Sequence, residues 1–293
     1  LNSVYQFLNK FGVENNQQFL FALGVIVFVI LIVSLTFKAI TTYAQVRFVF
    51  MREYSIGKRL VEGYLHQPYS WFLSRNSAEI GKTILSEVSQ VIGGGIKPLL
   101  EVIAQSMVVI ALLTLVILSD LKLALIVGFS LGGAYGSIFY FIRRYLNRIG
   151  KERLNHNELR FNLVSEAFGA SKEVKVGGLE QTYIQKFSES AQATAETAAS
   201  SQIVTQMPRY FLEAIAFGGI LLIILYMMAQ TDNFNNYLPI NSLYVFAGYR
   251  LMPAVQVIFA SLAKLTFVGA LIDNLNKDIK NFKPIDENND QEI

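Results

Sequence analysis

The sequence predicts an all-α membrane protein, and three of its features support this fold class. Of its 293 residues, 53% are hydrophobic and 16% are charged, and the mean hydropathy of +0.39 is high for a soluble chain of this length. Five apolar segments each approach the roughly twenty residues that a helix needs to cross a bilayer. Two charged connections of similar length, residues 38–101 and 143–210, keep a helical periodicity between these segments.

The five apolar segments are expected to span the membrane as helices. They cover residues 19–37, 102–119, 123–142, 211–229 and 238–263. Short links join the second segment to the third and the fourth to the fifth, so each of these pairs should form a tight hairpin. In the third segment, Gly128, Gly132 and Gly136 recur every four residues, a spacing that favours close helix packing.

The distribution of lysine and arginine predicts the orientation of the chain. These residues are frequent in both long connections and near the C-terminus, while the segments assigned to the opposite side carry only Lys10 and Lys122. Cytoplasmic loops retain positive charge, so the two connections and the C-terminus are expected in the cytoplasm. Residues 1–18 then form an extracytoplasmic loop. This arrangement predicts one further spanning helix upstream, so that the first of six helices is missing from this sequence.

The two connections are expected to be helical arms that extend the spanning helices into the cytoplasm. Proline is scarce in them, and apolar residues recur at helical spacing, as at Ile80, Ile84, Val88 and Ile92. Each pair of arms turns at a short punctuated stretch, "HQPYSWFLSRNSAE" in the first and "VKVGGLEQTY" in the second. Residues 93–95 are three glycines, which weaken a helix and leave open whether this arm is flexible.

Candidate sites for catalysis, nucleotides and metals find little support in the chain. Gly81-Lys82-Thr83 has the ending of a phosphate-binding loop, but Asn76 stands where that motif needs a glycine and no buried strand precedes it. Asn76 with Glu79 favours a helix start there instead. There are no cysteines, and His66 and His156 stand alone, so no catalytic or metal-binding residue is predicted.

Several stretches resemble the transmembrane domain of exporter-type ABC transporters. The stretches "YLHQPYSWFLSRNSAEIGKTILSEVSQV" and "EAFGASKEVKVGGLEQTYIQKF" are similar to the first and second intracellular loops of that family. "PRYFLEAIAF" and "YRLMPAVQVIFASL" are similar to bacterial flippases of lipid-linked oligosaccharides and to polysaccharide exporters. The resemblance covers nearly the whole chain and implies a transmembrane domain over residues 19–282, with two coupling-helix hairpins on the long cytoplasmic helices.

The resemblance also implies how the hairpins work. In that family their turns are coupling helices that lie in grooves on the ATP-binding domains and transmit the closure of those domains to the spanning helices. On this chain the turns would cover about residues 69–79 and 176–183. The coupling residues implied are Tyr69, Trp71, Phe72, Glu79, Gly178, Leu179 and Glu180.

The partners follow from the same resemblance. Residues 283–293 are acidic and aperiodic and are expected to be a linker toward an ATP-binding domain of the same polypeptide. This chain has neither a Walker motif nor an "LSGGQ" motif, so it binds no cofactor of its own, and ATP and Mg²⁺ are expected on that absent domain. The expected partners are a second transmembrane domain, in a homodimer or a heterodimer, and membrane lipid. The expected location is the bacterial inner membrane. Nucleic acid is not an expected partner.

A predicted substrate path comprises Arg250, Tyr249, Pro253 and Glu213. Arg250 lies near the middle of the last span, where an arginine costs several kcal/mol unless it faces protein, water or an anion. A guanidinium binds phosphate through two hydrogen bonds, which favours an anionic substrate such as a polyprenyl-pyrophosphate head. The alternative is an internal ion pair with a carboxylate. Glu213 also stands four residues after Arg209, at the spacing of an ion pair within one helix.

The sequence therefore favours the transmembrane part of an ATP-driven exporter or flippase of a lipid-linked oligosaccharide or related anionic lipid, working by alternating access. An exporter of lipid, peptide or drug is the alternative. A membrane-embedded lipid glycosyltransferase is less favoured, because it would need carboxylates or histidines clustered in a recognisable motif. A membrane scaffold without transport also remains open.

Overall fold

The computed structural model describes residues 16–73, 77–119, 121–230 and 238–280, and within them every regular element is a helix. The predicted all-α fold is confirmed. The chain divides into two units, residues 1–51 and 52–293. The elements are α2 (Asn16–Leu65), α3 (Tyr69–Leu73), α4 (Ser77–Lys82), η1 (Thr83–Glu87), α5 (Val88–Val91), η2 (Ile92–Ile96), α6 (Lys97–Ser119), α7 (Leu121–Gly169), α8 (Ser171–Val176), α9 (Glu180–Gln230) and α10 (Leu238–Lys280).

Four of these helices are much longer than a membrane is thick. α2, α7, α9 and α10 have 50, 49, 51 and 43 residues. At a rise of about 1.5 Å per residue each exceeds the roughly 30 Å of a hydrocarbon core by a wide margin. The apolar segments and the charged arms are thus continuous helices, as their periodicity predicts.

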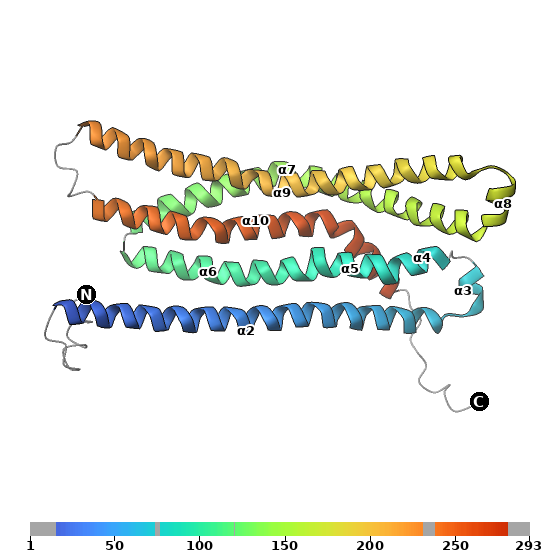
Figure 1. Ribbon diagram of the computed structural model, residues 1–293, viewed down its shortest axis with the longest axis horizontal. Helices are drawn as coiled ribbons and strands as arrows, with labels where there is room; N and C mark the ends of the chain where they lie inside the picture. The colour runs from blue at the N-terminus through green and yellow to red at the C-terminus, as the bar shows by residue number, and fades with distance from the viewer. Residues whose placement is uncertain (1–15, 74–76, 120, 231–237, 281–293) are drawn as a thin grey trace, which may run out of the picture. The chain divides into compact units, whose positions relative to one another are not determined.

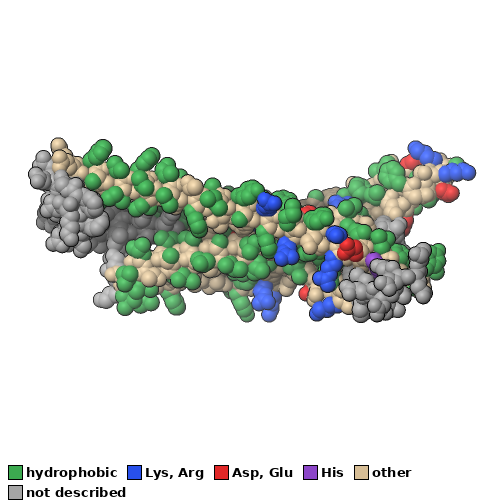
Figure 2. Space-filling model, turned by 90° about the horizontal axis from the view of Figure 1, so that it is seen from below, with side chains coloured by type: hydrophobic (Ala, Val, Ile, Leu, Met, Phe, Trp, Pro, Cys, Tyr) green, Lys and Arg blue, Asp and Glu red, His purple; other side chains and the backbone are tan. Residues whose placement is uncertain are grey.

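Three helices of the described part are long and apolar enough to cross a membrane: Gln17–Leu65, Glu79–Leu115 and Leu251–Lys280. The five predicted spanning segments also each fall within one helix, in the order α2, α6, α7, α9 and α10. In unit 1, the apolar side chains of α2 are exposed, for example Phe21, Val33 and Phe37. In Figure 2, charged side chains gather toward one end of the long helices, and the opposite end shows mainly hydrophobic side chains.

The core of unit 2 is built around α10, which packs against α6 and α7, while α9 packs along α7 (Figure 1). Phe259 of α10 meets the rings of Tyr135 and Phe139 of α7 at 5.4 and 6.3 Å between centroids. Gly150 of α7 allows the closest approach, because a Cβ there would overlap the carbonyl oxygen of Phe267. Among the described residues, the expected close packing at Gly132 and Gly136 is not found, since a Cβ there would meet nothing within 4 Å.

One arm is interrupted by two π-helical turns, η1 and η2, on either side of the short α5. The glycines of residues 93–95 lie in η2. A Cβ at Gly94 would lie 2.5 Å from Cγ2 of Val268, and one at Gly95 would lie 3.2 Å from Cδ1 of Ile272. Two of the three glycines are therefore explained by close packing against α10.

Candidate functional site

The first hairpin end is a sharp turn closed by backbone hydrogen bonds. After α2, the amide of Gln67 donates to the carbonyl of Tyr64 at 3.0 Å, and the amide of Trp71 donates to the carbonyl of Pro68 at 2.8 Å. Pro68 directly precedes the first helical residue of α3, where the missing N–H costs nothing. The buried side chain of Gln67 donates to the carbonyl of Gly63 at 3.0 Å. The turn is thus held by the backbone and by a buried amide.

The aromatic residues and the leucine of α3 divide into an inward and an outward set. Trp71 stacks 5.4 Å from the ring of Tyr64 and meets Phe72 edge to face at 5.2 Å. Tyr69 and Leu73 are 77% and 72% exposed. They are four residues apart on one helical turn and so share a face. Of the predicted contact residues, Tyr69 thus belongs to the exposed face, while Trp71 and Phe72 are half-buried and support the turn. Leu73 was missed, although its spacing from Tyr69 could have indicated it.

The second hairpin end contains a short transverse helix, α8, followed by a glycine turn. Gly178 has φ of +62°, a conformation that costs other residues energy. The amide of Leu179 donates to the carbonyl of Val174 at 3.0 Å, and that of Gly178 to Lys175 at 3.4 Å. These two bonds form a Schellman motif, which ends α8. α8 covers residues 171–176 and therefore overlaps the predicted turn, residues 176–183, only at Val176.

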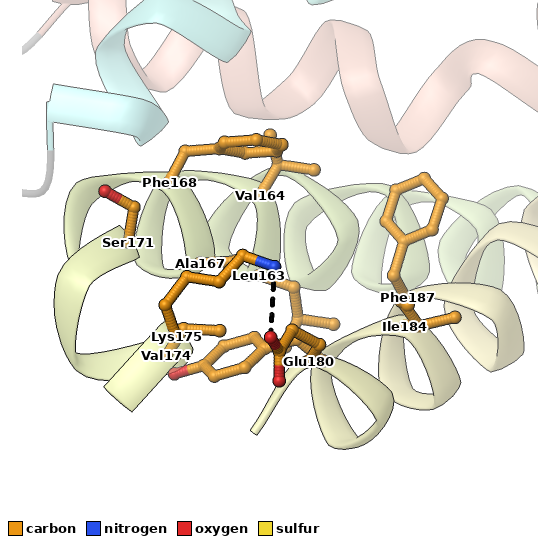
Figure 3. Close-up of a pocket in the computed structure, with 11 residues that line it drawn as sticks. Leu163, Val164, Ala167, Phe168, Ser171, Val174, Lys175, Glu180, Ile184 and Phe187 are labelled. Carbon is orange, nitrogen blue, oxygen red and sulfur yellow. Dashed lines mark hydrogen bonds and ion pairs between the residues drawn. The ribbon is translucent and has the colours of Figure 1, made fainter. Parts of the chain in front are cut away.

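An apolar pocket of about 380 Å³ lies inside the second hairpin end (Figure 3). α7, α8 and α9 contribute its walls, among them Leu163, Phe168, Val174, Ile184 and Phe187. Its rim carries an ion pair between the Nζ of Lys175 and the Oε1 of Glu180, 3.0 Å apart. A backbone N–H of Glu180 and then the Lys175 ammonium lower the pKa of the Glu180 carboxyl.

The predicted coupling residues thus form two separate groups. Tyr69, Trp71 and Phe72 lie on α3, and Glu79 follows on α4. Gly178, Leu179 and Glu180 lie together where α8 turns into α9. In Figure 1, α3 and α8 lie at the same end of unit 2. Val176, the first residue of the predicted second turn, is 82% exposed beside the second group, and Phe168, which lies outside the predicted turn, is 77% exposed. Both ends therefore present apolar side chains on a turn closed by backbone hydrogen bonds.

The predicted substrate path lies where α9 and α10 face each other. The Oε1 of Glu213 accepts from Nε of Arg209 at 2.9 Å and from Nε2 of Gln256 at 3.1 Å. The ion pair expected from the spacing of Arg209 and Glu213 is therefore present. The ring of Tyr249 lies 6.5 Å from that of Phe217. Gln256 joins the two helices and was not indicated by the sequence.

Two further residues of that path are in α10. α10 runs unbroken through Pro253, and the helix turns only in its C-terminal part (Figure 1). The side chain of Arg250 lies outside the described ones, so its predicted contact with an anion or a carboxylate stays a prediction. Among the described residues, no group of histidines and carboxylates could hold a metal ion.

The long apolar helices and exposed apolar surface define a multi-pass helical membrane protein. Its hairpin ends carry exposed apolar side chains, among them Tyr69, Leu73 and Val176. Residues 3–253 match the family described as the ABC transporter transmembrane region. The chain belongs to this family and is an exporter-type transmembrane domain. Such a domain works with a nucleotide-binding domain and a second transmembrane domain.

Proposed function

We propose that this chain is the transmembrane part of an ATP-driven flippase that moves a lipid-linked oligosaccharide or a related anionic lipid across the bacterial inner membrane. The observation that carries the transport role is the family match over residues 3–253. The anionic substrate is supported by Arg250 in the last predicted span, because an arginine at that depth needs an anion, water or protein beside it.

The hairpin ends are proposed as the contacts with the ATP-binding domains. Tyr69 and Leu73 on α3 and Val176 on α8 are largely exposed apolar groups on short rigid elements. Exposed apolar clusters of this kind favour a protein partner. The unbroken α7 and α9 then carry a displacement of α8 into the membrane, because packed helices move as bodies rather than deform.

The substrate claim is tested by ATP hydrolysis of the full-length protein in proteoliposomes. We expect vanadate-sensitive hydrolysis that rises when a polyprenyl-pyrophosphate oligosaccharide is added and that drives its transfer between leaflets. Arg250→Ala should lower this transfer. ATP hydrolysis measured without substrate should stay largely unchanged in this variant and serves as the reference. If peptides or drugs stimulate hydrolysis and the lipid-linked saccharide does not, the proposed substrate class is wrong, while the proposed exporter function stands.

The coupling claim is tested by truncating the exposed face of α3. Tyr69→Ala and Leu73→Ala are each expected to reduce substrate-stimulated hydrolysis severalfold, because an interface anchor that loses its side chain costs about 1 kcal/mol or more. Leu85→Ala is the matched control, since Leu85 is also an exposed apolar residue but lies on the arm. Equal effects of all three variants would contradict the proposed contact.

A further inference from the structure

Unit 2 contains a second, larger cavity whose lining is polar and basic. It measures about 540 Å³ and lies between the arms rather than at a hairpin end. We call it the basic pocket, defined by the residues that line it. These are Gln90, Gly93, Gly94, Arg153, Ala198, Ser201, Gln202, Thr205, Gln206, Ala260, Lys264, Phe267 and Val268. The lining residues come from five elements: α5, η2, α7, α9 and α10.

Two cations on opposite helices carry the charge of this pocket. Arg153 comes from α7 and Lys264 from α10, and no carboxylate belongs to the lining. Among the described residues, neither cation forms a salt bridge with a carboxylate. Some cations elsewhere on the arms are paired, as Lys82 is with Glu87 and Arg148 with Glu152. The basic pocket therefore has an unbalanced positive charge.

The guanidinium of Arg153 is held in place and partly removed from water. It lies over the ring of Phe267 at 5.2 Å from the centroid, an attraction that favours this position. Burial, and secondly the neighbouring Arg160, lower the pKa of this guanidinium. A cation held in a partly buried place without a counter-charge is costly unless an anion joins it.

Neutral hydrogen-bonding groups complete the lining. Ser201 and Thr205 are buried on the wall from α9, one helical turn apart, and the hydroxyl of Thr205 donates to the carbonyl of Ser201 at 2.7 Å. The amides of Gln202 and Gln206 belong to the same wall. The hydroxyl of Ser201 and these amides, beside two cations, suit an anion with several acceptor oxygens, and a guanidinium suits phosphate in particular. The volume exceeds that of one phosphate and admits a diphosphate or a phosphate with a head group attached.

We propose that the basic pocket binds a phosphate-bearing anion, with Arg153 and Lys264 as its charged ligands. Two sources share this chemistry, the head group of an anionic lipid and a free phosphate compound. Lys264 directly follows the predicted span 238–263, and Gln206 shortly precedes the predicted span 211–229. A lipid head group can reach this depth if the predicted topology holds; the anion site itself does not depend on the proposed transport.

The test measures binding without ATP, so that its failure is distinct from a failure of transport. The full-length protein in nanodiscs of phosphatidylcholine receives inorganic pyrophosphate, and in a second arm phosphatidic acid is part of the nanodisc. Binding is read from the rise in melting temperature and from native mass spectrometry. Saturable binding in either arm supports the site, and the arm that binds identifies the source as soluble phosphate or as lipid.

Arg153→Gln and Lys264→Gln are each expected to weaken this binding about tenfold or more, because each removes a charge-assisted hydrogen bond. Arg153→Lys keeps the positive charge and should retain part of the affinity. This variant therefore distinguishes the loss of the charge from a failure to fold. The matched control is Lys151→Gln with Lys277→Gln, which removes two exposed cations from the same helices, α7 and α10, outside the pocket. Absence of binding in both arms, or an equal loss in the control, would overturn the proposal.

Discussion

At the scale of single residues, a few glycines decide how closely the helices of unit 2 approach. Gly150 lies against the backbone of Phe267, and Gly94 lies against the side chain of Val268. Both contacts join α10 to another arm. Neither glycine belongs to the regular four-residue repeat in α7 that looked most like a packing motif. Close approach thus depends on where helices cross, which a single sequence does not reveal.

Gly150→Ala is expected to destabilise the protein by about 1–3 kcal/mol, because the new methyl group must displace backbone rather than a flexible side chain. Gly269→Ala on α10 is the control, since a Cβ there meets nothing within 4 Å and alanine favours a helix by up to about 1 kcal/mol. Thermal unfolding of both variants in detergent measures the difference. Equal melting temperatures would contradict the described packing.

A buried charge cluster is the second feature at this scale. The Nζ of Lys82 lies 3.1 Å from Oε1 of Glu87 and 3.6 Å from Oε2 of Glu158 on α7. The side chains of Lys82 and Glu87 are each 5% exposed. A buried pair is costly to break, because the remaining charge keeps its desolvation penalty.

Lys82→Met is therefore expected to cost about 3 kcal/mol or more of unfolding free energy, and the double variant Lys82→Met with Glu87→Leu should recover a large part of it. Lys58→Met removes the exposed partner of Glu62 and should cost well under about 1 kcal/mol. Denaturant titrations give these values. If the double variant were as unstable as the sum of both single ones, the two groups would not act as a pair.

At the scale of elements, the π-helical turn η1 explains why Lys82 and Glu87 meet. The residues are five apart, a spacing that an α-helix does not place on one face, whereas a π-helical turn bonds residue i to residue i+5. η1 holds one residue more than a regular turn, and Leu85 within it is exposed.

Deletion of Leu85 is accordingly expected to convert η1 into a regular turn and to preserve the register of α6 against α10. The melting temperature should change by only a few degrees, roughly the effect of 1 kcal/mol in a chain of this size. Deletion of Leu99, an exposed residue of α6, has no π turn to absorb it and should rotate the helix beyond it by about 100°. Equal tolerance of both deletions would contradict this role of η1.

The sequence predicted the elements far better than their junctions. Apolar runs and the scarcity of proline predicted long helices, and the spacing of Arg209 and Glu213 predicted their ion pair. The π turns were missed because helical periodicity tolerates one inserted residue, and the pair of Lys82 and Glu87 was missed with them. Tyr69, Trp71 and Phe72 were all predicted as coupling residues, because residue type alone does not tell that the ring of Trp71 lies against Tyr64.

The basic pocket shows the same limit. Arg153 and Lys264 are far apart in the sequence, and each is a common residue in a charged arm. Their nearness depends on the packing of α7 against α10, which Gly150 and Phe267 determine. Gln256, which connects α10 to Glu213 on α9, was not predicted either, because this contact also depends on how the helices pack.

At the scale of the whole molecule, the proposed contacts with ATP-binding domains require that the charged ends of the long helices lie in the cytoplasm. The charged arms, the hairpin ends and the basic pocket all belong to one side of the predicted spans. If that side faces the cytoplasm, the exposed residues of α3 and α8 can meet ATP-binding domains, and the basic pocket can receive an anion from the inner leaflet. The opposite orientation would remove the proposed contacts with the ATP-binding domains and the access of the basic pocket to the inner leaflet, but not the anion site itself.

The most direct test of this orientation uses single cysteines, because the chain has none of its own. In a full-length protein without other cysteines, Ser89→Cys and Ser188→Cys place exposed thiols on the two arms, and Asn235→Cys places one in the predicted outer link. A membrane-impermeant maleimide added to intact cells should label only the variant at 235, and the arm variants should react only in inside-out vesicles. Labelling of either arm from outside intact cells would contradict the account.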